Sequence, residues 1–396
     1  MPILFQINVA ANWGSHGRIA EEIGKKVMAE GWESYIAYGR YANSSRSHLV
    51  KVGSAADQMI HGFQSLMLDR HGLGSVGATW KLIREIEWVS PDVIHLHNIH
   101  GFYLSYPTLF RYLSESGIPV VWTFHDCWPF TGHCAQPVYA QCNRWTYLCE
   151  DCPLTHSAYP KSYFVDRSTK NFLQKQKEFT SVPNLHIVTV SKWLEQQVRA
   201  SFFKDVDVRT IYNGIDTSVF KPSGSNKKSR LVLGVANKWY DWKGLEDFYR
   251  LRQLLPSDYE ILLVGLDRQK KRLPKGISVI PRTDSAQALV NLYGRASVYV
   301  NPSRAETFGM TTAEALACGT PAVVYQTTAC PELIDGVTGK AVPLGDVGAL
   351  AAAVRQICEK PEPTVQEACR QRALQLFDCH ASYQSYLELY DELLRK

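Results

Sequence analysis

A chain of 396 residues is too long for one compact core, because domains usually hold about 100–200 residues, so two or three domains are expected. Hydrophobic residues make up 45% of the sequence and charged residues 20%, which excludes a disordered or fibrous chain. The formal net charge of +5 is too small for a dedicated nucleic-acid-binding protein, in which basic residues form a clustered excess.

No apolar run approaches the roughly 18 residues that a membrane span requires, so we expect at most peripheral contact with a membrane. The stretch from Met1 to Ala11 is too short for a signal peptide and lacks its basic flank. We therefore expect a cytoplasmic protein, and in that compartment the 10 cysteines are interpreted as thiols or metal ligands before disulfides.

Short apolar runs alternate with amphipathic stretches through the first half of the chain, and each run is interpreted as a strand followed by a helix. The elements expected there, in chain order, are strand 3–9, helix 18–30, strand 93–96, helix 103–116, strand 120–124, strand 187–190, a helix from the N-cap Ser191 to residue 200, and strand 208–212.

A second series of the same kind begins after the polar stretch 216–229, whose proline, glycine, serine and lysine residues are typical of a linker. Its expected elements are strand 231–235, helix 245–255, strand 260–264, helix 286–295, strand 298–300, helix 311–317, strand 322–325, and helices 347–359, 364–377 and 381–395. Alternation of strands and helices predicts two α/β domains with parallel, doubly wound sheets. Ligands of such sheets bind beyond the carboxyl ends of the strands.

Glycine-containing loops follow the first strand of each half. Gly14 and Gly17 would let backbone amides approach a phosphate ahead of a helix, although a tight turn explains them equally well. In the second half, Lys243 precedes Gly244 at a helix start, where a cation beside unpaired amides suits a diphosphate. Two solvated surface lysines, Lys238 and Lys243, are the alternative there.

The segment 302–315 carries the strongest pattern in the sequence. Glu306 lies in the loop that leaves a predicted strand, and Glu314 follows about two turns into a helix that Thr311 or Thr312 can cap. One carboxylate in the loop and one on the helix can bind hydroxyls on two parts of a sugar-bearing ligand. The alternative is a pair of surface glutamates on an amphipathic helix.

Glu306 and Glu314, in the setting Pro-Ser-x-x-Glu-x-Phe-Gly-Met, resemble the signature of the retaining glycosyltransferases of GT-B architecture (glycosyltransferase group 1, family 4). Nearer likeness is to the enzymes of bacterial capsule, O-antigen and colanic-acid polysaccharide synthesis. The resemblance covers nearly the whole chain, and further matches lie at 14–17, 124–126, 213–216, 243–244 and 331–333.

This resemblance implies two Rossmann-like doubly wound domains that face a cleft. An acceptor-side domain is expected at 1–215 with a cysteine-rich insertion at 127–160, followed by a linker at 216–229. A nucleotide-sugar-binding domain is expected at 230–378, and a C-terminal helix at 379–396 is expected to pack back on the first domain.

The resemblance also implies roles for the residues of the carboxylate segment. Glu306 would contact the transferred sugar beside its anomeric carbon, and Glu314 would hydrogen-bond the ribose hydroxyls of the nucleotide. The backbone amides of Phe308, Gly309 and Met310 would bind phosphate or sugar hydroxyls.

Other roles follow from the remaining matches. Lys243 would neutralise the diphosphate, His125 would lie at the reacting sugar, and Gly14 would face the phosphates from the first domain. The family commonly has an arginine shortly before this lysine, whereas here Lys238 places a single-point ammonium where a bidentate guanidinium is usual. Glu306, His125 and Lys243 are therefore the expected catalytic residues.

Retention implies an oxocarbenium-like state in which negative charge grows on the leaving diphosphate, and lysine and helix-start amides would stabilise that charge. The incoming hydroxyl would give its proton to the departing phosphate, so neither a dedicated base nor a catalytic metal is expected. Asp205 and Asp207 spell Asp-x-Asp, but they lie in a connection of the first half and are interpreted as solvated loop residues.

A cysteine cluster gives a separate signal. Cys134, Cys142, Cys149 and Cys152 fall within 19 residues of a segment that has few periodic apolar residues. Four thiolates would bind zinc in a closed, structural site, and the metal would explain how such a segment is ordered. Only the last pair has zinc-knuckle spacing, so ordinary buried or free thiols are the alternative, with disulfides third.

We therefore expect a retaining glycosyltransferase that moves a sugar from a UDP- or GDP-sugar to a glycan or polyprenyl-diphosphate-linked acceptor at the inner membrane face. Arg40, Arg46, Lys51 and Arg70 are candidates for weak contact with that membrane, and scattered surface charge is the alternative. A nucleotide-sugar epimerase or hydrolase of the same fold and, in a different class, a noncatalytic zinc-stabilised binding protein stay open. No nucleic-acid partner is expected.

Overall fold

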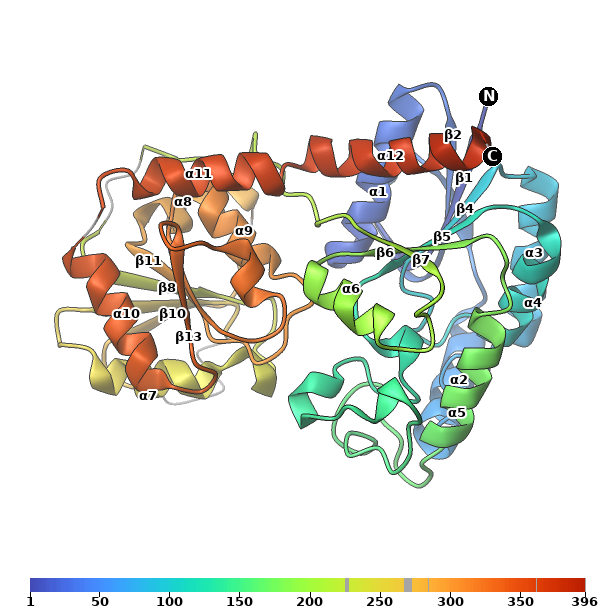
Figure 1. Ribbon diagram of the computed structural model, residues 1–396, viewed down its shortest axis with the longest axis horizontal. Helices are drawn as coiled ribbons and strands as arrows, with labels where there is room; N and C mark the ends of the chain where they lie inside the picture. The colour runs from blue at the N-terminus through green and yellow to red at the C-terminus, as the bar shows by residue number, and fades with distance from the viewer. Residues whose placement is uncertain (225–227, 267–272, 284, 361, 396) are drawn as a thin grey trace. The chain divides into compact units, whose positions relative to one another are not determined.

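The computed structural model describes residues 1–224, 228–266, 273–283, 285–360 and 362–395. The chain forms two compact units, which are described separately. Unit 1 comprises Met1–Ile211 with Tyr383–Lys396, and unit 2 comprises Tyr212–Ser382. In each unit, helices cover a parallel sheet (Figure 1).

The described residues of unit 1 form a seven-stranded parallel sheet with the order β3-β2-β1-β4-β5-β6-β7. Its strands are β1 (Ile3–Ala11), β2 (Glu33–Ala42), β3 (His48–Lys51), β4 (Val93–Leu96), β5 (Val120–Phe124), β6 (Leu185–Thr189) and β7 (Asp207–Thr210). Each residue of β4 and β5 is buried, as expected for parallel strands covered on both faces. The strand order reverses between β1 and β4, so the loops after these strands border the expected ligand crevice.

The helices of unit 1 are α1 (Gly14–Ala29), α2 (Ala55–Leu68), α3 (Val76–Val89), α4 (Tyr106–Ser116), α5 (Ser168–Phe179), α6 (Lys192–Arg199) and most of α12 (Cys379–Arg395). The hydroxyls of Tyr386 and Tyr390 on α12 lie 3.1 Å from Thr123 Oγ1 and 2.6 Å from His95 Nδ1. Both tyrosines are almost fully buried, so residues 383–395 complete the core of this unit.

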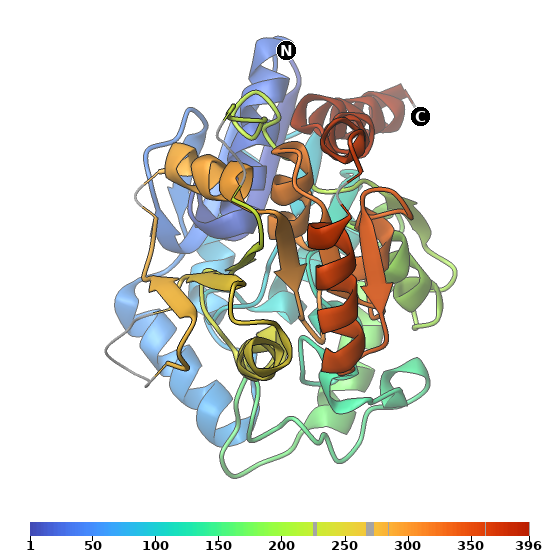
Figure 2. The same ribbon diagram turned by 90° about the vertical axis from the view of Figure 1, so that its left-hand side faces the viewer.

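Unit 2 repeats the pattern, and its described residues form a six-stranded parallel sheet with the order β10-β9-β8-β11-β12-β13. Its strands are β8 (Leu231–Val235), β9 (Glu260–Val264), β10 (Ile277–Ile280), β11 (Val298–Asn301), β12 (Ala322–Tyr325) and β13 (Gly339–Val342). Its helices are α7 (Leu245–Leu254), α8 (Ala286–Arg295), α9 (Met310–Ala317), α10 (Val347–Glu359) and α11 (Val365–Leu376). Helices α7 and α10 pack together on one face, and α8 and α9 lie on the other (Figures 1 and 2).

The two sheets confirm the predicted α/β class with doubly wound parallel sheets. Residues 32–92, for which no element is predicted from the sequence, form β2, β3, α2 and α3. Helix α2 explains part of this omission, because it buries the polar His61 and Ser65 and exposes apolar side chains. None of the helices in the described parts of the chain is long and apolar enough to span a bilayer.

Candidate functional site

Two of the predicted catalytic residues meet in unit 2. Glu306 lies in the loop between β11 and α9, and Lys243 ends the short 3-10 turn Asp241–Lys243 that follows β8. Lys243 Nζ donates to Glu306 Oε1 across 2.6 Å, and the side chains are 26% and 13% exposed. The sheet order reverses between β8 and β11, so this ion pair lies where a doubly wound sheet binds its ligand.

Backbone contacts fix the loops that carry this ion pair. The Glu306 amide donates to Thr328 Oγ1 across 3.0 Å, which joins the loop after β11 to the loop after β12. Gly244 has a φ of +71°, and a Cβ there would lie 2.2 Å from the carbonyl oxygen of Pro302. Only glycine therefore fits beside Lys243, and the loops after β8 and β11 touch at that point.

Glu314 lies half-buried on α9, where its Oε2 accepts a hydrogen bond from the Tyr293 hydroxyl at 2.9 Å. The Phe308 ring is 2% exposed and packs against Phe377, so only the backbone of Phe308 is available to a ligand. Residues 306 and 314 therefore occupy the loop and the helix that the sequence predicts, and each already has a polar partner.

Helix α9 begins without a side-chain cap. It starts at Met310 after Gly309, which has a φ of +107°. The expectation that Thr311 or Thr312 caps the helix is wrong, because Gly309 holds the N-cap position and both threonines lie inside the helix, where their hydroxyls accept hydrogen bonds from side chains of β11. The N-cap glycine thus offers no side-chain acceptor to the first amides of α9, a condition that suits phosphate oxygens.

Lys238 differs from Lys243 in its surroundings. It is exposed, and its Nζ lies 4.8 Å from the centre of the Tyr240 ring, which stacks on Trp242. Of these two lysines, Lys243 is the one in contact with the predicted catalytic glutamate.

In unit 1, predicted Gly14 and His125 lie at the carboxyl end of the sheet among further histidines. Gly14 has a φ of +70° and begins α1 directly after β1, which places His16 in the first turn of that helix. His97 follows β4, and its Nδ1 lies 3.2 Å from His125 Nε2, just after β5. The ring centres of His16 and His125 are 6.0 Å apart.

Burial keeps these rings neutral near pH 7. It lowers the pKa of His16 to about 4, with a smaller effect from His100. Burial, followed by neighbouring histidines, holds the pKa of His97 and of His125 well below the usual 6.5. Neutral imidazoles can accept or donate hydrogen bonds to sugar hydroxyls without bringing a charge into the site.

Asp126, the neighbour of His125, belongs to a second polar group. Its carboxylate lies 2.9 Å from His100 Nε2, and the other ring nitrogen of His100 lies 3.0 Å from the Tyr159 hydroxyl. Burial alone would raise the pKa of Asp126, but the His100 ring and the hydrogen bonds outweigh it and lower that pKa. Asp126 is therefore an ionised carboxylate held beside His125.

Of these histidines, only His125 was predicted from the sequence as a site residue. The pattern His95-Leu-His97-Asn-Ile-His100 was an available signal, because it places three histidines in and just after a buried strand. Ligands of a parallel sheet bind beyond the carboxyl ends of its strands. The predicted strand 93–96 therefore already indicates that the ring nitrogens of the histidines at its end can reach a ligand.

The predicted zinc site is not assembled in the structure. No group of three or more His, Cys, Asp or Glu side chains within the described ranges is arranged to hold a metal ion. Cys134 and Cys152 form a hydrogen-bonded thiol pair, which lowers the pKa of Cys152 to about 6, while the Cys149 sulfur accepts the Gly132 amide at 3.2 Å. Cys142 is, like the other three, a free thiol.

A buried lysine contacts the start of this segment. Lys175 Nζ donates to the carbonyls of Trp128 and Thr131 at 2.7 and 3.0 Å and lies 3.5 Å from the centre of the Trp128 ring. Burial lowers the pKa of Lys175 to about 7. The start of the insertion is therefore tied to α5 by a side chain that the sequence analysis did not name.

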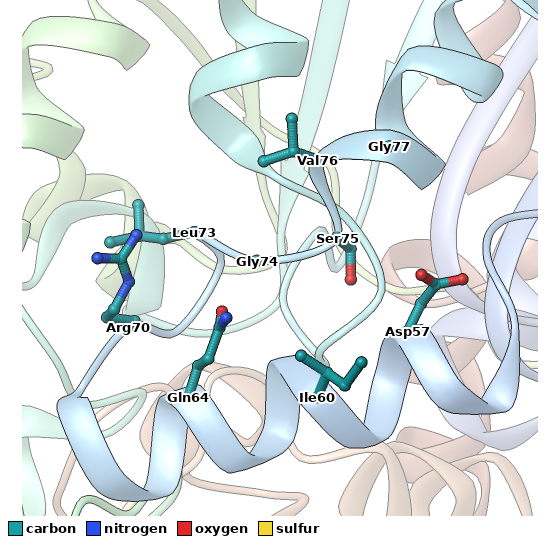
Figure 3. Close-up of a pocket in the computed structure, with 9 residues that line it drawn as sticks. All are labelled: Asp57, Ile60, Gln64, Arg70, Leu73, Gly74, Ser75, Val76 and Gly77. Carbon is teal, nitrogen blue, oxygen red and sulfur yellow. The ribbon is translucent and has the colours of Figure 1, made fainter.

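Two other features of unit 1 lie apart from these predicted residues. Asp207 of the Asp-x-Asp sequence begins β7 and lies 2.9 Å from His186 Nδ1. A hollow of about 300 Å³ between α2 and the start of α3 is lined by Ile60, Arg70 and Val76, among others (Figure 3). No residue predicted for catalysis or donor binding lines that hollow.

The fold is the GT-B fold of glycosyltransferases, and two family models match the chain. One is described as Glycosyltransferase Family 4 and matches residues 16–219, and the other, described as Glycosyl transferases group 1, matches residues 229–360. The chain therefore belongs to glycosyltransferase family 4.

Individual relatives and solved structures match nearly the whole chain at low sequence identity. The putative colanic acid biosynthesis glycosyl transferase WcaC of Escherichia coli K12 is 22% identical over 98% of this chain and 100% of its own length. Sucrose-phosphate synthase from Thermosynechococcus elongatus has a TM-score of 0.76 at 18% identity, with both chains fully covered. Anabaena Alr3699/HepE in complex with UDP has a TM-score of 0.69 at 15% identity, with 99% and 100% of the chains covered.

The buried histidines predict acid sensitivity of unit 1. Burial lowers the pKa of His61 and His16 to about 4, so between pH 6.5 and 4 the unfolded chain binds more protons than the folded one. The contribution of each buried ring to the free energy of unfolding is then fully present above pH 6.5. It falls on acidification, and at pH 5 roughly 1–2 kcal/mol per fully buried ring is lost. Urea unfolding at pH 7.5 and 5.0 measures this loss.

Two variants control for this effect. His61→Gln removes one such ring and should shrink the acid-induced loss, whereas His48→Gln, at an exposed position on β3, should leave it unchanged. Equal unfolding free energies of the wild type at the two pH values would contradict the prediction.

Proposed function

We propose that this chain is a retaining glycosyltransferase that takes a sugar from a UDP- or GDP-sugar bound to unit 2 and passes it to an acceptor bound to unit 1. The observation that carries this proposal is the contact of Lys243 with Glu306 at the switch point of the unit 2 sheet, beside the uncapped start of α9. UDP is present in the complex of the similar Anabaena protein, which supports a nucleotide-sugar donor.

The geometry suggests how each group acts on such a donor. The Lys243 ammonium and the first amides of α9 stabilise the charge that grows on the leaving diphosphate, because both are fixed before the reaction begins. Glu306 orients Lys243 through their hydrogen bond, and it contacts the transferred sugar once the donor binds. Glu314 binds the ribose hydroxyls, and the departing phosphate takes the acceptor's proton, so these residues perform the transfer without a divalent metal.

The acceptor in this proposal is a glycan, or a glycan carried on a polyprenyl diphosphate, in the synthesis of a surface polysaccharide such as capsule or O-antigen. The similarity to a putative colanic acid enzyme along the full length of both chains supports this class of acceptor. His125 and the histidines around it supply the hydrogen-bonding groups that a sugar acceptor requires.

Substitutions test the donor site. Lys243→Ala should lower kcat by about 30- to 1,000-fold, the equivalent of 2–4 kcal/mol for one preorganised donor. Glu306→Ala should lower kcat more than it weakens nucleotide binding, and Glu314→Ala should do the reverse. Transfer from labelled UDP- and GDP-sugars gives kcat, calorimetry gives nucleotide affinity, and NMR of the product gives its anomeric configuration.

Lys238→Ala is the matched control, because its ammonium lies over the Tyr240 ring, and it should cost less than about tenfold. Equally small losses for both lysines would contradict the role of Lys243. An inverted product would contradict retention, and release of free or epimerised sugar without acceptor would favour a hydrolase or epimerase instead.

We propose one structural zinc per chain, held by Cys134, Cys142, Cys149 and Cys152. The hydrogen-bonded pair of Cys134 and Cys152 and the amide that donates to Cys149 support it, although the described side chains do not enclose a metal position. Metal analysis should find about one zinc per chain. Cys152→Ser should lower the thermal midpoint, and Cys358→Ser on α10 is the matched control.

Brief EDTA treatment should leave turnover intact, because Lys243 and backbone amides carry the phosphate charge. Metal-free protein of full stability would contradict the zinc site. Loss of turnover in EDTA that magnesium or manganese restores would contradict catalysis without a metal.

We also propose that unit 1 lies against an anionic bilayer, where a lipid-linked acceptor would be found. Helix α2 turns apolar side chains outward, since Met59, Ile60 and Phe63 are 72%, 60% and 61% exposed. Phe164, 77% exposed, follows Tyr163, whose amide donates to α2 at 2.7 Å. Exposed aromatic and aliphatic groups on a helix are typical of a surface that dips into the headgroup region.

Of the four basic candidates, Arg70 shares a hollow with a residue of this apolar face. It lines the same hollow as Ile60 and is exposed, so its guanidinium can meet lipid phosphates while the apolar groups insert (Figure 3). Arg40, by contrast, lies over the rings of Tyr41 and Phe102.

Vesicle flotation tests this surface. The protein should float with phosphatidylglycerol-containing vesicles at low salt and less with phosphatidylcholine alone. Ile60→Gln with Phe63→Gln should abolish flotation, and Leu394→Gln, an exposed apolar position on α12, should not. Flotation that survives the double substitution would contradict membrane binding through this surface. Dimers of the wild type that do not float would indicate that the surface binds a protein partner instead.

A further inference from the structure

Two amide side chains interrupt the apolar strand β1. Gln6 and Asn8 are 0% exposed, lie two residues apart and therefore point to the same face of the sheet. Each one hydrogen-bonds a histidine at the carboxyl end of unit 1. Neither residue was singled out by the sequence analysis.

Backbone carbonyls and amides fix which way both side-chain amides point. Gln6 Nε2 donates to the Ala20 carbonyl at 2.8 Å, and a carbonyl oxygen can only accept, so Gln6 Oε1 is the atom on the opposite side. Asn8 Nδ2 donates to the Ala10 carbonyl at 2.8 Å, and Asn8 Oδ1 accepts the Val9 amide at 3.0 Å. If either side-chain amide were flipped, its oxygen would face a backbone carbonyl oxygen and no hydrogen bond could form there.

The orientation of Gln6 determines the protons on two rings. Its Oε1 lies 3.0 Å from His97 Nε2, which must therefore carry a hydrogen. His97 is 1% exposed with no carboxylate in hydrogen-bond contact, so burial keeps its pKa well below the usual value and it holds only that one proton. His97 Nδ1 is then an acceptor, and His125 Nε2, 3.2 Å away, must be the donor.

Asn8 does the same for one further ring. Its Oδ1 lies 3.1 Å from His16 Nδ1, so that nitrogen carries the hydrogen and the lone pair is on Nε2. Burial lowers the pKa of His16 to about 4, so the ring is neutral at pH 7.

We propose that Gln6 and Asn8 are positioning residues that hold His125 in the Nε2–H tautomer and His16 in the Nδ1–H tautomer. The lone pairs then lie on His125 Nδ1 and His16 Nε2, atoms that can only accept a hydrogen bond. His16 Nε2 suits an acceptor substrate that offers a hydroxyl group as donor, an inference that rests on the proposed function of unit 1.

Nitrogen NMR of protein labelled with ¹⁵N-histidine tests the tautomers directly. At pH 7.5 the wild type should show His97 and His125 as Nε2–H and His16 as Nδ1–H. In Gln6→Glu, a carboxylate replaces the amide, His97 becomes an imidazolium that donates from both nitrogens, and His125 should switch to Nδ1–H. Asn8→Asp should likewise convert His16 to an imidazolium. His125 that stays Nε2–H in Gln6→Glu would overturn the proposal.

Two more variants keep the test decisive. Gln58→Glu on α2 makes the same substitution in unit 1 away from these rings, and it should leave the signals of His16, His97 and His125 unchanged. If Gln6→Glu does not fold, Gln6→Leu removes the acceptor for His97, and the His125 signals should move to values between those of the two tautomers. A pure Nε2–H signal for His125 in Gln6→Leu would overturn the proposal.

Kinetics separate this inference from the proposed function. Gln6→Glu should lower kcat/KM for the acceptor at least tenfold and leave the affinity for UDP or GDP within twofold of wild type. A switched tautomer with unchanged transfer would support the positioning role and overturn the part of the proposed function that places His125 at the reacting sugar. An unswitched tautomer with normal transfer would overturn the positioning role and leave the proposed function in place.

Discussion

Parallel strands buried on both faces impose the main constraint on this protein. Such strands have no solvated side, so polar chemistry is confined to the loops beyond their carboxyl ends. The ion pair of Lys243 with Glu306 follows from this constraint in unit 2, and the contact of His97 with His125 follows from it in unit 1. Gln6 and Asn8 lie inside a strand instead, and each hydrogen-bonds through both its side-chain nitrogen and its oxygen, as burial of an amide requires.

Much of the fold was predictable because its signals are local. Strands 93–96, 120–124, 231–235, 260–264 and 322–325 have the predicted bounds, since each is an apolar run between turn residues. Helix α2 was not predictable in this way, because its polar His61 is buried and its apolar Ile60 is exposed. Periodicity identifies a helix by the face that it buries in its own core, and α2 reverses that relation.

The candidate site was predictable where its residues are close in the sequence and therefore also close in the structure. Glu306 and Glu314 lie on one loop and the helix that follows it, so their separation in sequence describes their setting. The histidine contacts join β1, β4 and β5, and such long-range contacts leave no mark in a single sequence beyond the residues themselves. The cysteines show the reverse case, because close sequence spacing predicted a four-ligand cluster that the described side chains do not form.

The last turns of α12 have a consequence for synthesis of the chain. Tyr390 contacts His95 at 2.6 Å in the core of unit 1, yet the ribosome makes it only after the whole of unit 2. Because chains fold from the N-terminus as they emerge, unit 2 can close its core while unit 1 still lacks part of its own. The first 211 residues therefore leave the ribosome as an incomplete domain with apolar surface exposed, which is the kind of species that chaperones bind.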